Sequence, residues 1–172
     1  MSLTFYYAPQ SSASPTHWIL EELKVPYEKV RVDLKAEEQK KEKFLKLNPN
    51  AKIPVIVDHD GPDGRPITVF ESGAILMYLA EKSGRFMPKD TRARYEVLQW
   101  LMVQISTVGP MTGQLGYFFM HGPKDGTGDH AIARYTTEVT RLYKLVDKRL
   151  AENEWMGGKE YTIADMAFYP WY

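Results

Sequence analysis

The chain has 172 residues, of which 44% are apolar and 26% charged, so it is long enough to bury a core and has the composition of a globular protein. Its 22 Lys and Arg residues balance 22 Asp and Glu residues, which argues against binding to nucleic acid or to an anionic membrane and favours neutral or small partners. No apolar run is long enough to span a bilayer and residues 1–4 do not start a secretory signal, so we predict a cytoplasmic protein.

The first part of the chain has the pattern of a strand, a helix and a second strand. Residues 3–7 are rich in β-forming side chains. Ser14 followed by Pro15 is a favourable N-cap and first turn for an amphipathic helix. Residues 27–34 alternate in polarity, which predicts a strand parallel to the first and reached by a right-handed crossover.

The next segment predicts a helix, a hairpin and another helix. Residues 36–47 are highly charged with few apolar anchors, which indicates a weak, exposed helix. Residues 55–57 and 66–70 flank a turn rich in Gly and Asp, the pattern of an antiparallel hairpin. Residues 71–84 have the apolar spacing of a helix and end in glycine.

Pro54 stands at the mouth of the strand 55–57, where a residue without an N–H is tolerated only at the first position, at an edge or at a bulge. A trans proline that begins an ordinary strand is the commoner geometry. The alternative is a cis Ile53–Pro54 bond, which costs about 0.5–1 kcal/mol over trans. A cis bond would turn the N–H and C=O of Ile53 outward, where an extended ligand could bind them.

The second half of the chain is helical in its periodicity. Apolar residues at steps of three and four predict a long amphipathic helix over 95–105, which we expect Gly109-Pro110 to interrupt. A second helix over 132–150 follows a Gly-, Asp- and Lys-rich loop at 121–129.

A third helix is predicted to begin after Thr162. Gly157-Gly158 ends the preceding helix, and Thr162 has the position of an N-cap with Asp165 in place of the usual Glu of a capping box. The chain ends within this predicted helix, at Tyr172.

The change of periodicity predicts two domains. We expect an α/β domain at 1–83 with the order βαβαββα, a linker at 84–91 and an all-α domain at 92–172. The sequence contains no cysteine, which excludes disulfides, thiolate metal sites and a cysteine nucleophile, so any thiol chemistry must use a thiol supplied by a cofactor. The four histidines have no ligand spacing, and we assign no metal.

The order of the elements, with a proline entering the third strand, is the thioredoxin-like plan. Motifs over nearly the whole chain resemble those of the cytosolic glutathione transferases, namely Asn48-Pro49 with Lys52-Ile53-Pro54-Val55, Phe70-Glu71-Ser72-Gly73-Ala74-Ile75 with Tyr78-Leu79, and Tyr161-Thr162-Ile163-Ala164-Asp165. Within that family the chain is most similar to the bacterial nu-class branch of glutathione-dependent disulfide-bond reductases, through Leu98-Gln99-Trp100-Leu101-Met102, Gly109-Pro110-Met111 and Arg141-Leu142-Tyr143.

The resemblance implies glutathione as co-substrate and a cis Pro54. The backbone of Ile53 is expected to pair with the cysteinyl part of glutathione like an added strand. Glu71 and Ser72 match the family's residues for the γ-glutamyl end, where Ser72 and the first amides of a helix can hold a carboxylate and Glu71 an ammonium. Without the resemblance, the same pair equally fits a plain helix N-cap beside a surface acid.

Three more polar residues are expected at the glycyl end of glutathione by the same resemblance: Lys52, Gln39 and Lys41. Without it, each fits a solvated surface residue.

The thiol-activating residue is expected in the loop after the first strand. Glutathione reacts as thiolate, and lowering a thiol pKa of about 8.5 by two units, roughly 2.7 kcal/mol, would make it mainly thiolate at neutral pH. Alignment with related enzymes puts Gln10 where a catalytic Ser or Thr is usual. A shift of the loop by one residue would put Ser11 in that position, so we expect Ser11 as the first candidate, Ser12 as the second and Tyr7 as the third. Tyr7 is equally suited to a core position.

The acceptor substrate is expected between the two domains, against apolar and polar residues of the first long helix: Met102, Met111, Gln114, Tyr117 and Phe118. Arg134 is a further polar candidate. The resemblance implies a homodimeric glutathione transferase that attacks electrophiles or disulfides. The alternative is a non-catalytic binding or scaffold protein of the same fold, which Gln10 favours. Family members continue through further helices, so we expect either that this sequence is incomplete or that the protein is truncated.

Overall fold

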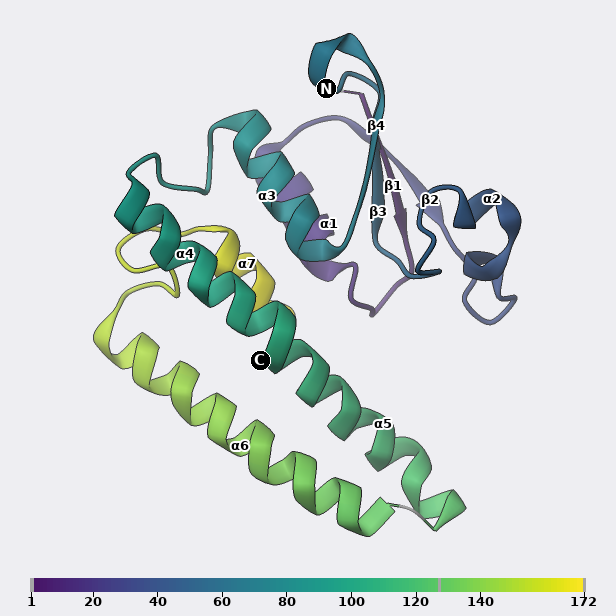
Figure 1. Cartoon of the computed structure of the whole chain (residues 1–172), viewed down its shortest axis with the longest axis vertical. Coiled ribbons are helices and arrows are strands. Elements are labelled where there is room, and N and C mark those ends of the chain that lie inside the picture. The colour runs from purple at the N-terminus through teal and green to yellow at the C-terminus, as the bar shows by residue number, and fades with distance from the viewer. Residues whose placement is uncertain (1, 127, 172) are drawn as a thin grey trace. The chain divides into compact units, whose positions relative to one another are not determined.

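The computed structural model of the chain describes residues 2–126 and 128–171 (Figure 1). The chain divides into two compact units, Met1–Arg85 and Phe86–Tyr172, each of which has its own core.

Unit 1 is built on a four-stranded sheet of β1 (Leu3–Tyr7), β2 (Tyr27–Arg31), β3 (Val55–Asp58) and β4 (Ile67–Phe70), in the order β2-β1-β3-β4. β2 is parallel to β1, while β3 is antiparallel to both β1 and β4. The predicted strand–helix–strand unit and hairpin are therefore confirmed. β2 ends at Arg31, earlier than predicted, because the Asp33 carboxylate accepts hydrogen bonds from the Lys35 and Ala36 amides at 2.9 and 3.1 Å and turns the chain.

The helices of unit 1 are α1 (Ser14–Leu23), α2 (Glu42–Leu45) and α3 (Ser72–Ser83). The ring of Phe5 lies 5.8 Å from that of His17 in α1, and the ring of Tyr6 lies 6.2 Å from that of Phe44 in α2. Because successive strand residues point to opposite faces, α1 and α2 lie on opposite faces of the sheet. α3 packs beside α1 (Figure 1). The largest fully buried side chains of this unit are Phe5, Ile19, Leu20, Val55, Ile56, Ile75, Leu76 and Leu79.

Two local expectations for unit 1 are corrected. The N-cap of α1 is Ala13, not Ser14, whose hydroxyl instead donates to the Ser11 carbonyl at 3.0 Å. The single helix expected at 36–47 is broken into a 3₁₀ turn and the short α2, with the extended residue Lys41 between them. Only Phe44 of this segment's helical residues is buried, so there is no continuous apolar stripe to hold a longer helix.

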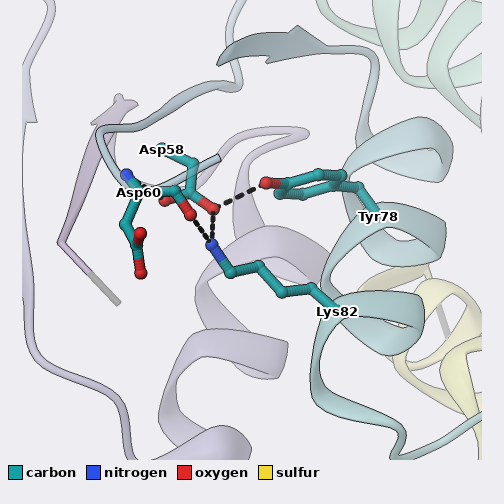
Figure 2. A network of polar contacts seen from close by, with 4 residues as sticks. All are labelled: Asp58, Asp60, Tyr78 and Lys82. Carbon is teal, nitrogen blue, oxygen red and sulfur yellow. Dashed lines mark hydrogen bonds and ion pairs between the residues drawn. The ribbon is translucent and has the colours of Figure 1, made fainter. Parts of the chain in front are cut away.

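A buried polar network joins the end of β3 to α3 (Figure 2). The side chain of Asp58 is fully buried, and its Oδ2 accepts from Tyr78 Oη at 2.6 Å and from Lys82 Nζ at 2.5 Å. Its other oxygen accepts from the Asp60 amide at 3.0 Å, and Lys82 also donates to the Asp60 carbonyl. All the oxygens of this carboxylate are thereby satisfied, as a buried charge requires.

Unit 2 is helical, with α4 (Thr91–Val103), a π turn (Gln104–Val108), α5 (Gly109–Asp125), α6 (Gly128–Glu152) and α7 (Ile163–Phe168), followed by a 3₁₀ turn (Tyr169–Trp171). The expected interruption at Gly109-Pro110 is wrong. The π turn carries the helix through, with the Gly109 amide bonded to the Gln104 carbonyl, and Pro110, which has no N–H to donate, follows directly after this wide turn.

The connection between α5 and α6 is shorter than the predicted loop at 121–129. α5 continues to Asp125 and Gly126 adopts a left-handed conformation with φ of 74°. Gly122 and Gly128 let the two helices approach closely here: a Cβ on Gly122 would lie 2.6 Å from the Gly128 Cα.

The start of α7 is as predicted. Thr162 is the N-cap, its hydroxyl accepts from the Ala164 amide at 3.3 Å, and the Asp165 carboxylate accepts from the Thr162 amide at 2.9 Å. α6, by contrast, ends at Glu152 rather than at Gly157-Gly158. None of the helices in the described part of the chain is long and apolar enough to cross a membrane.

Candidate functional site

A cavity of about 200 Å³ lies in unit 1 where the approach to β3 meets the start of α3. It combines hydroxyl, amide, ammonium and carboxylate groups within one concave surface. Its lining residues are Ser12, Asn48, Asn50, Lys52, Ile53, Pro54, Glu71 and Ser72. Five residues that the sequence assigned to a glutathione site are thus brought together with Ser12.

Asn48 shapes this cavity, and sequence reasoning did not assign it a role. It is 1% exposed, its Nδ2 donates to the Lys52 carbonyl at 2.7 Å and its Oδ1 accepts from the Asn50 amide at 2.9 Å. These bonds fold residues 48–52 into a compact turn that presents Lys52 to the cavity. The Asn48-Pro49-Asn50 sequence was the available signal, because an Asx turn followed by proline orders a loop locally.

The Ile53–Pro54 peptide bond is cis. The trans alternative is therefore excluded and the family expectation is confirmed. Ile53 is 7% exposed, and its carbonyl accepts from the Ser12 hydroxyl at 3.2 Å. Within the described residues, the Ile53 N–H has no protein acceptor, so this donor beside the cavity remains available to a ligand.

Glu71 and Ser72 form the opposite wall. Glu71 has a φ of 70°, rare for a residue with a side chain, and directly precedes α3. The turn brings Glu71 Oε1 to 3.5 Å from Asn50 Nδ2. Ser72 begins α3, whose first-turn amides have no intrahelical acceptor and form the positive end of the helix dipole. This wall therefore places a carboxylate next to a helix start whose unpaired amides could hold an anion.

The three hydroxyl candidates differ in position. Ser12 is exposed and lines the cavity. Ser11 is outside the lining, and its hydroxyl donates to the Ala8 carbonyl at 2.6 Å and accepts from the Ala13 amide at 3.2 Å, so it stabilises the loop. Tyr7 is also outside the lining. Its ring stacks on that of Phe5, with 5.4 Å between the ring centroids.

The candidates for the glycyl end are separated. Lys52 is exposed and lines the cavity. Gln39 and Lys41 are not part of the lining. Lys41 Nζ lies 3.8 Å from Glu38 Oε1 and contributes to another cavity, on the face of the sheet that α2 covers.

The acceptor candidates lie in unit 2. Met102 and Tyr117 are 45% and 52% exposed, so their side chains are accessible on α4 and α5. The ring of Phe118 instead stacks on that of Tyr135 in α6, with 5.7 Å between the ring centroids, so Phe118 packs the two helices together. Among the remaining candidates, Met111 is half-buried and Gln114 and Arg134 are exposed. No group of three metal-ligating side chains is found over residues 2–126 and 128–171.

Unit 1 has the strand order and the cis proline of a thioredoxin-like domain, with a cavity at the start of α3. A helical unit follows it in the chain. Residues 1–81 match the glutathione S-transferase N-terminal domain. The disulfide-bond oxidoreductase YfcG of Escherichia coli is 45% identical over 170 residues, which cover 98% of this chain and 78% of YfcG. The disulfide-bond oxidoreductase YghU of the same organism is 44% identical over 129 residues, 75% of this chain and 43% of YghU.

Solved structures agree with these relationships. A glutathione transferase from Burkholderia graminis, with two glutathione molecules bound per subunit, has a TM-score of 0.95 at 43% identity over 99% of this chain and 71% of that one. A glutathione transferase from Pseudomonas putida, with one glutathione disulfide bound per subunit, has a TM-score of 0.94 at 41% identity over 99% of this chain and 74% of that one. The chain belongs to the glutathione S-transferase family.

Proposed function

We propose that the cavity binds glutathione and that the protein uses the bound thiolate to reduce disulfides. The observation that carries the proposal is the gathering of Ser12, Ile53, Glu71 and Ser72 around one cavity in a protein without cysteine. The relatives named disulfide-bond oxidoreductases, and the similar structures that hold two glutathiones or one glutathione disulfide, support this choice.

The γ-glutamyl end of glutathione carries a carboxylate and an ammonium group. The carboxylate is placed against the Ser72 hydroxyl and the first amides of α3, where charge-assisted hydrogen bonds and the helix dipole both favour an anion. The ammonium pairs with the Glu71 carboxylate beside it. The glycyl carboxylate at the other end is assigned to Lys52, and Gln39 and Lys41 remain weaker candidates because they lie outside the lining.

The cysteinyl part is placed along Ile53. Its carbonyl would accept from the free Ile53 N–H, as in β-strand addition. This arrangement brings the sulfur to the side of the cavity that Ser12 lines. The Ser12 hydroxyl now donates to the Ile53 carbonyl at 3.2 Å and would turn to donate to the thiolate. Ser12 therefore replaces Ser11 as our first candidate for stabilising the thiolate, with Tyr7 still third.

The reaction balances without a protein thiol. The thiolate of the bound glutathione attacks one sulfur of the substrate disulfide, and the substrate's other sulfur leaves as a thiolate that takes up a proton. A second glutathione thiolate then attacks the glutathione sulfur of the mixed disulfide, releasing the second substrate thiol and glutathione disulfide. Conjugation of an electrophilic carbon would use the same bound thiolate in a single displacement.

We also assign the acceptor substrate to the exposed residues Met102, Gln114 and Tyr117 with Met111, and give Phe118 and Arg134 lower weight. A cytoplasmic homodimer remains part of the proposal. Sedimentation that shows only monomer at micromolar concentration would count against the dimer.

Calorimetric titration with reduced and oxidised glutathione, together with a hydroxyethyl disulfide assay and an aryl halide conjugation assay, tests the function. We expect binding and turnover of the disulfide. Ser72→Ala should weaken glutathione binding about tenfold by removing a hydrogen bond to a charged group. The matched control Ser83→Ala, at the opposite end of α3, should leave it unchanged. If neither form of glutathione binds, the proposal is wrong.

A non-catalytic glutathione-binding or scaffold protein is the second candidate. Gln10 favours it, because this exposed residue with a φ of 50° occupies the position where related enzymes have a hydroxyl. Glutathione binding without turnover in either assay would support this alternative.

A further inference from the structure

Unit 1 contains a second cavity, of about 290 Å³, on the face of the sheet that α2 covers. It shares no lining residue with the cavity beside Pro54. We call it the α2 cavity, and its lining residues are Tyr6, Val30, Arg31, Val32, Glu38, Lys41, Lys43, Phe44 and Leu47. Its volume is near the lower limit for small-molecule sites, so only a small ligand would fit.

The floor of the α2 cavity is apolar. Tyr6 of β1 and Phe44 of α2 meet edge to face at 6.2 Å between ring centroids. Val30 lies on the neighbouring strand in register with Tyr6, and Leu47, two residues after α2, completes the apolar part of the lining. Phe44 is held in place because it is only 6% exposed. This fixed aromatic and aliphatic surface suits the hydrocarbon part of a ligand.

The rim of the α2 cavity is cationic. Arg31, Lys41 and Lys43 face a single carboxylate in the lining, that of Glu38. That carboxylate already accepts from the Asp33 amide at 2.8 Å and lies 3.8 Å from the Lys41 ammonium. Over the described residues, neither Arg31 nor Lys43 has an ion-pair partner within 4.0 Å, although the chain as a whole carries no net charge. The lining therefore has a net positive charge, although Asp33, which lies outside the lining, interacts electrostatically with Arg31.

We propose that the α2 cavity binds a small organic monocarboxylate with an apolar body. The carboxylate lies between Arg31 and Lys43, where charge-assisted hydrogen bonds are available, and the hydrocarbon covers Tyr6 and Phe44. The proposal is independent of glutathione binding, because the two cavities have separate linings.

Titration of the ¹⁵N-labelled full chain with octanoate, followed by NMR, tests this site. We expect saturable shifts of the Tyr6, Val30 and Phe44 amides. Octanol, which has the same chain length without the charge, should bind more weakly. Arg31→Gln combined with Lys43→Gln should raise the octanoate dissociation constant about fivefold, because each partly exposed ion pair contributes modestly.

The matched control is Lys35→Gln combined with Lys29→Gln, which removes two exposed cations outside the lining. It should leave octanoate binding unchanged, and saturating glutathione should not displace octanoate. Absence of shifts at millimolar octanoate, equal binding by the Arg31/Lys43 and control variants, or displacement by glutathione would each overturn the proposal. Because these variants change exposed side chains, an unchanged spectrum without ligand verifies that the fold is retained.

Discussion

The carboxylate of Asp58 lies 2.5 Å from the ammonium of Lys82, fully buried at the end of β3 and facing the last turns of α3 (Figure 2). β3 begins just after Pro54 and α3 begins at Ser72, and both residues line the proposed glutathione cavity. The ion pair therefore joins the far ends of the two elements whose near ends form that cavity.

Replacing Asp58 by Asn is expected to destabilise unit 1 by about 3 kcal/mol, because it leaves the Lys82 ammonium without its charged partner in a largely buried position. Urea denaturation at neutral pH measures the change. Asp63→Asn, in the exposed turn between β3 and β4, is the control and should change stability by less than about 0.5 kcal/mol. Equal effects of the two variants would contradict a special role for the buried pair.

The same pair predicts a pH dependence of stability. Burial alone would raise the pKa of Asp58, but hydrogen bonds from Lys82, Tyr78 and the Asp60 amide outweigh burial and hold the pKa below its ordinary value. A carboxyl whose pKa is lower when folded stabilises the protein above its unfolded pKa, near 4. That contribution should decline as the pH falls below about 4, and Asp58→Asn should reduce the decline.

Ser12→Ala is expected to slow disulfide turnover about 10- to 100-fold at neutral pH, the loss of one hydrogen bond to a developing thiolate. The loss should be smaller at high pH, because the pKa of the bound thiol rises and its ionisation then requires a higher pH. Ser11→Ala is the comparison: it removes the bonds to Ala8 and Ala13 and should lower stability without moving the pH profile. A shift of the profile by Ser11→Ala alone would restore Ser11 as the activating residue.

Two glycines of α5 should respond oppositely to alanine. In Gly122→Ala the new methyl group would lie 2.6 Å from the Cα of Gly128, so α5 and α6 must separate, at a cost of about 2–3 kcal/mol. Gly116 has nothing within 4 Å of the corresponding position, and Gly116→Ala should stabilise the helix by about 0.5–1 kcal/mol. Thermal unfolding of the two variants measures both effects, and loss of stability in both would exclude this explanation.

Asp165→Ala should be among the most destabilising changes in unit 2. Its carboxylate accepts from the Met156 amide at 2.7 Å and the Thr162 amide at 2.9 Å, which fastens the preceding loop to the start of α7. We expect a loss of about 2–3 kcal/mol in urea denaturation. Asp129→Ala, in the exposed first turn of α6, loses only a favourable helix-dipole interaction and should cost less than about 1 kcal/mol.

Patterns set by local chemistry predicted much of the fold. The alternation at 27–34, the turn before Ile67 and the glycine that ends α3 each act within a few residues, so the sequence alone identifies them. The capping pair Thr162 and Asp165 was predicted for the same reason.

The predictions for the site were less accurate where hydrogen bonds to backbone groups set the position of a side chain. The Ser11 hydroxyl is bonded within its own loop, to the Ala8 carbonyl, while the exposed Ser12 is bonded to the Ile53 carbonyl, 41 residues away. Asn48 was overlooked because its role is to order the backbone around Lys52, not to present a reactive group. Helical spacing suggested the acceptor candidates, which stay predictions, but it could not distinguish the accessible Tyr117 from the packed Phe118.

The π turn at Gln104–Val108 joins α4 to α5 and affects which way the side chains of α5 point. A π turn holds one residue more than an α turn, and each residue rotates a helix by about 100°. If the same residues formed regular α turns instead, the extra residue would rotate the α5 side chains about the axis and carry Phe118 away from Tyr135. The wide turn therefore keeps the exposed and packed faces of α5 in place, and shortening the turn by one residue should leave those faces unchanged.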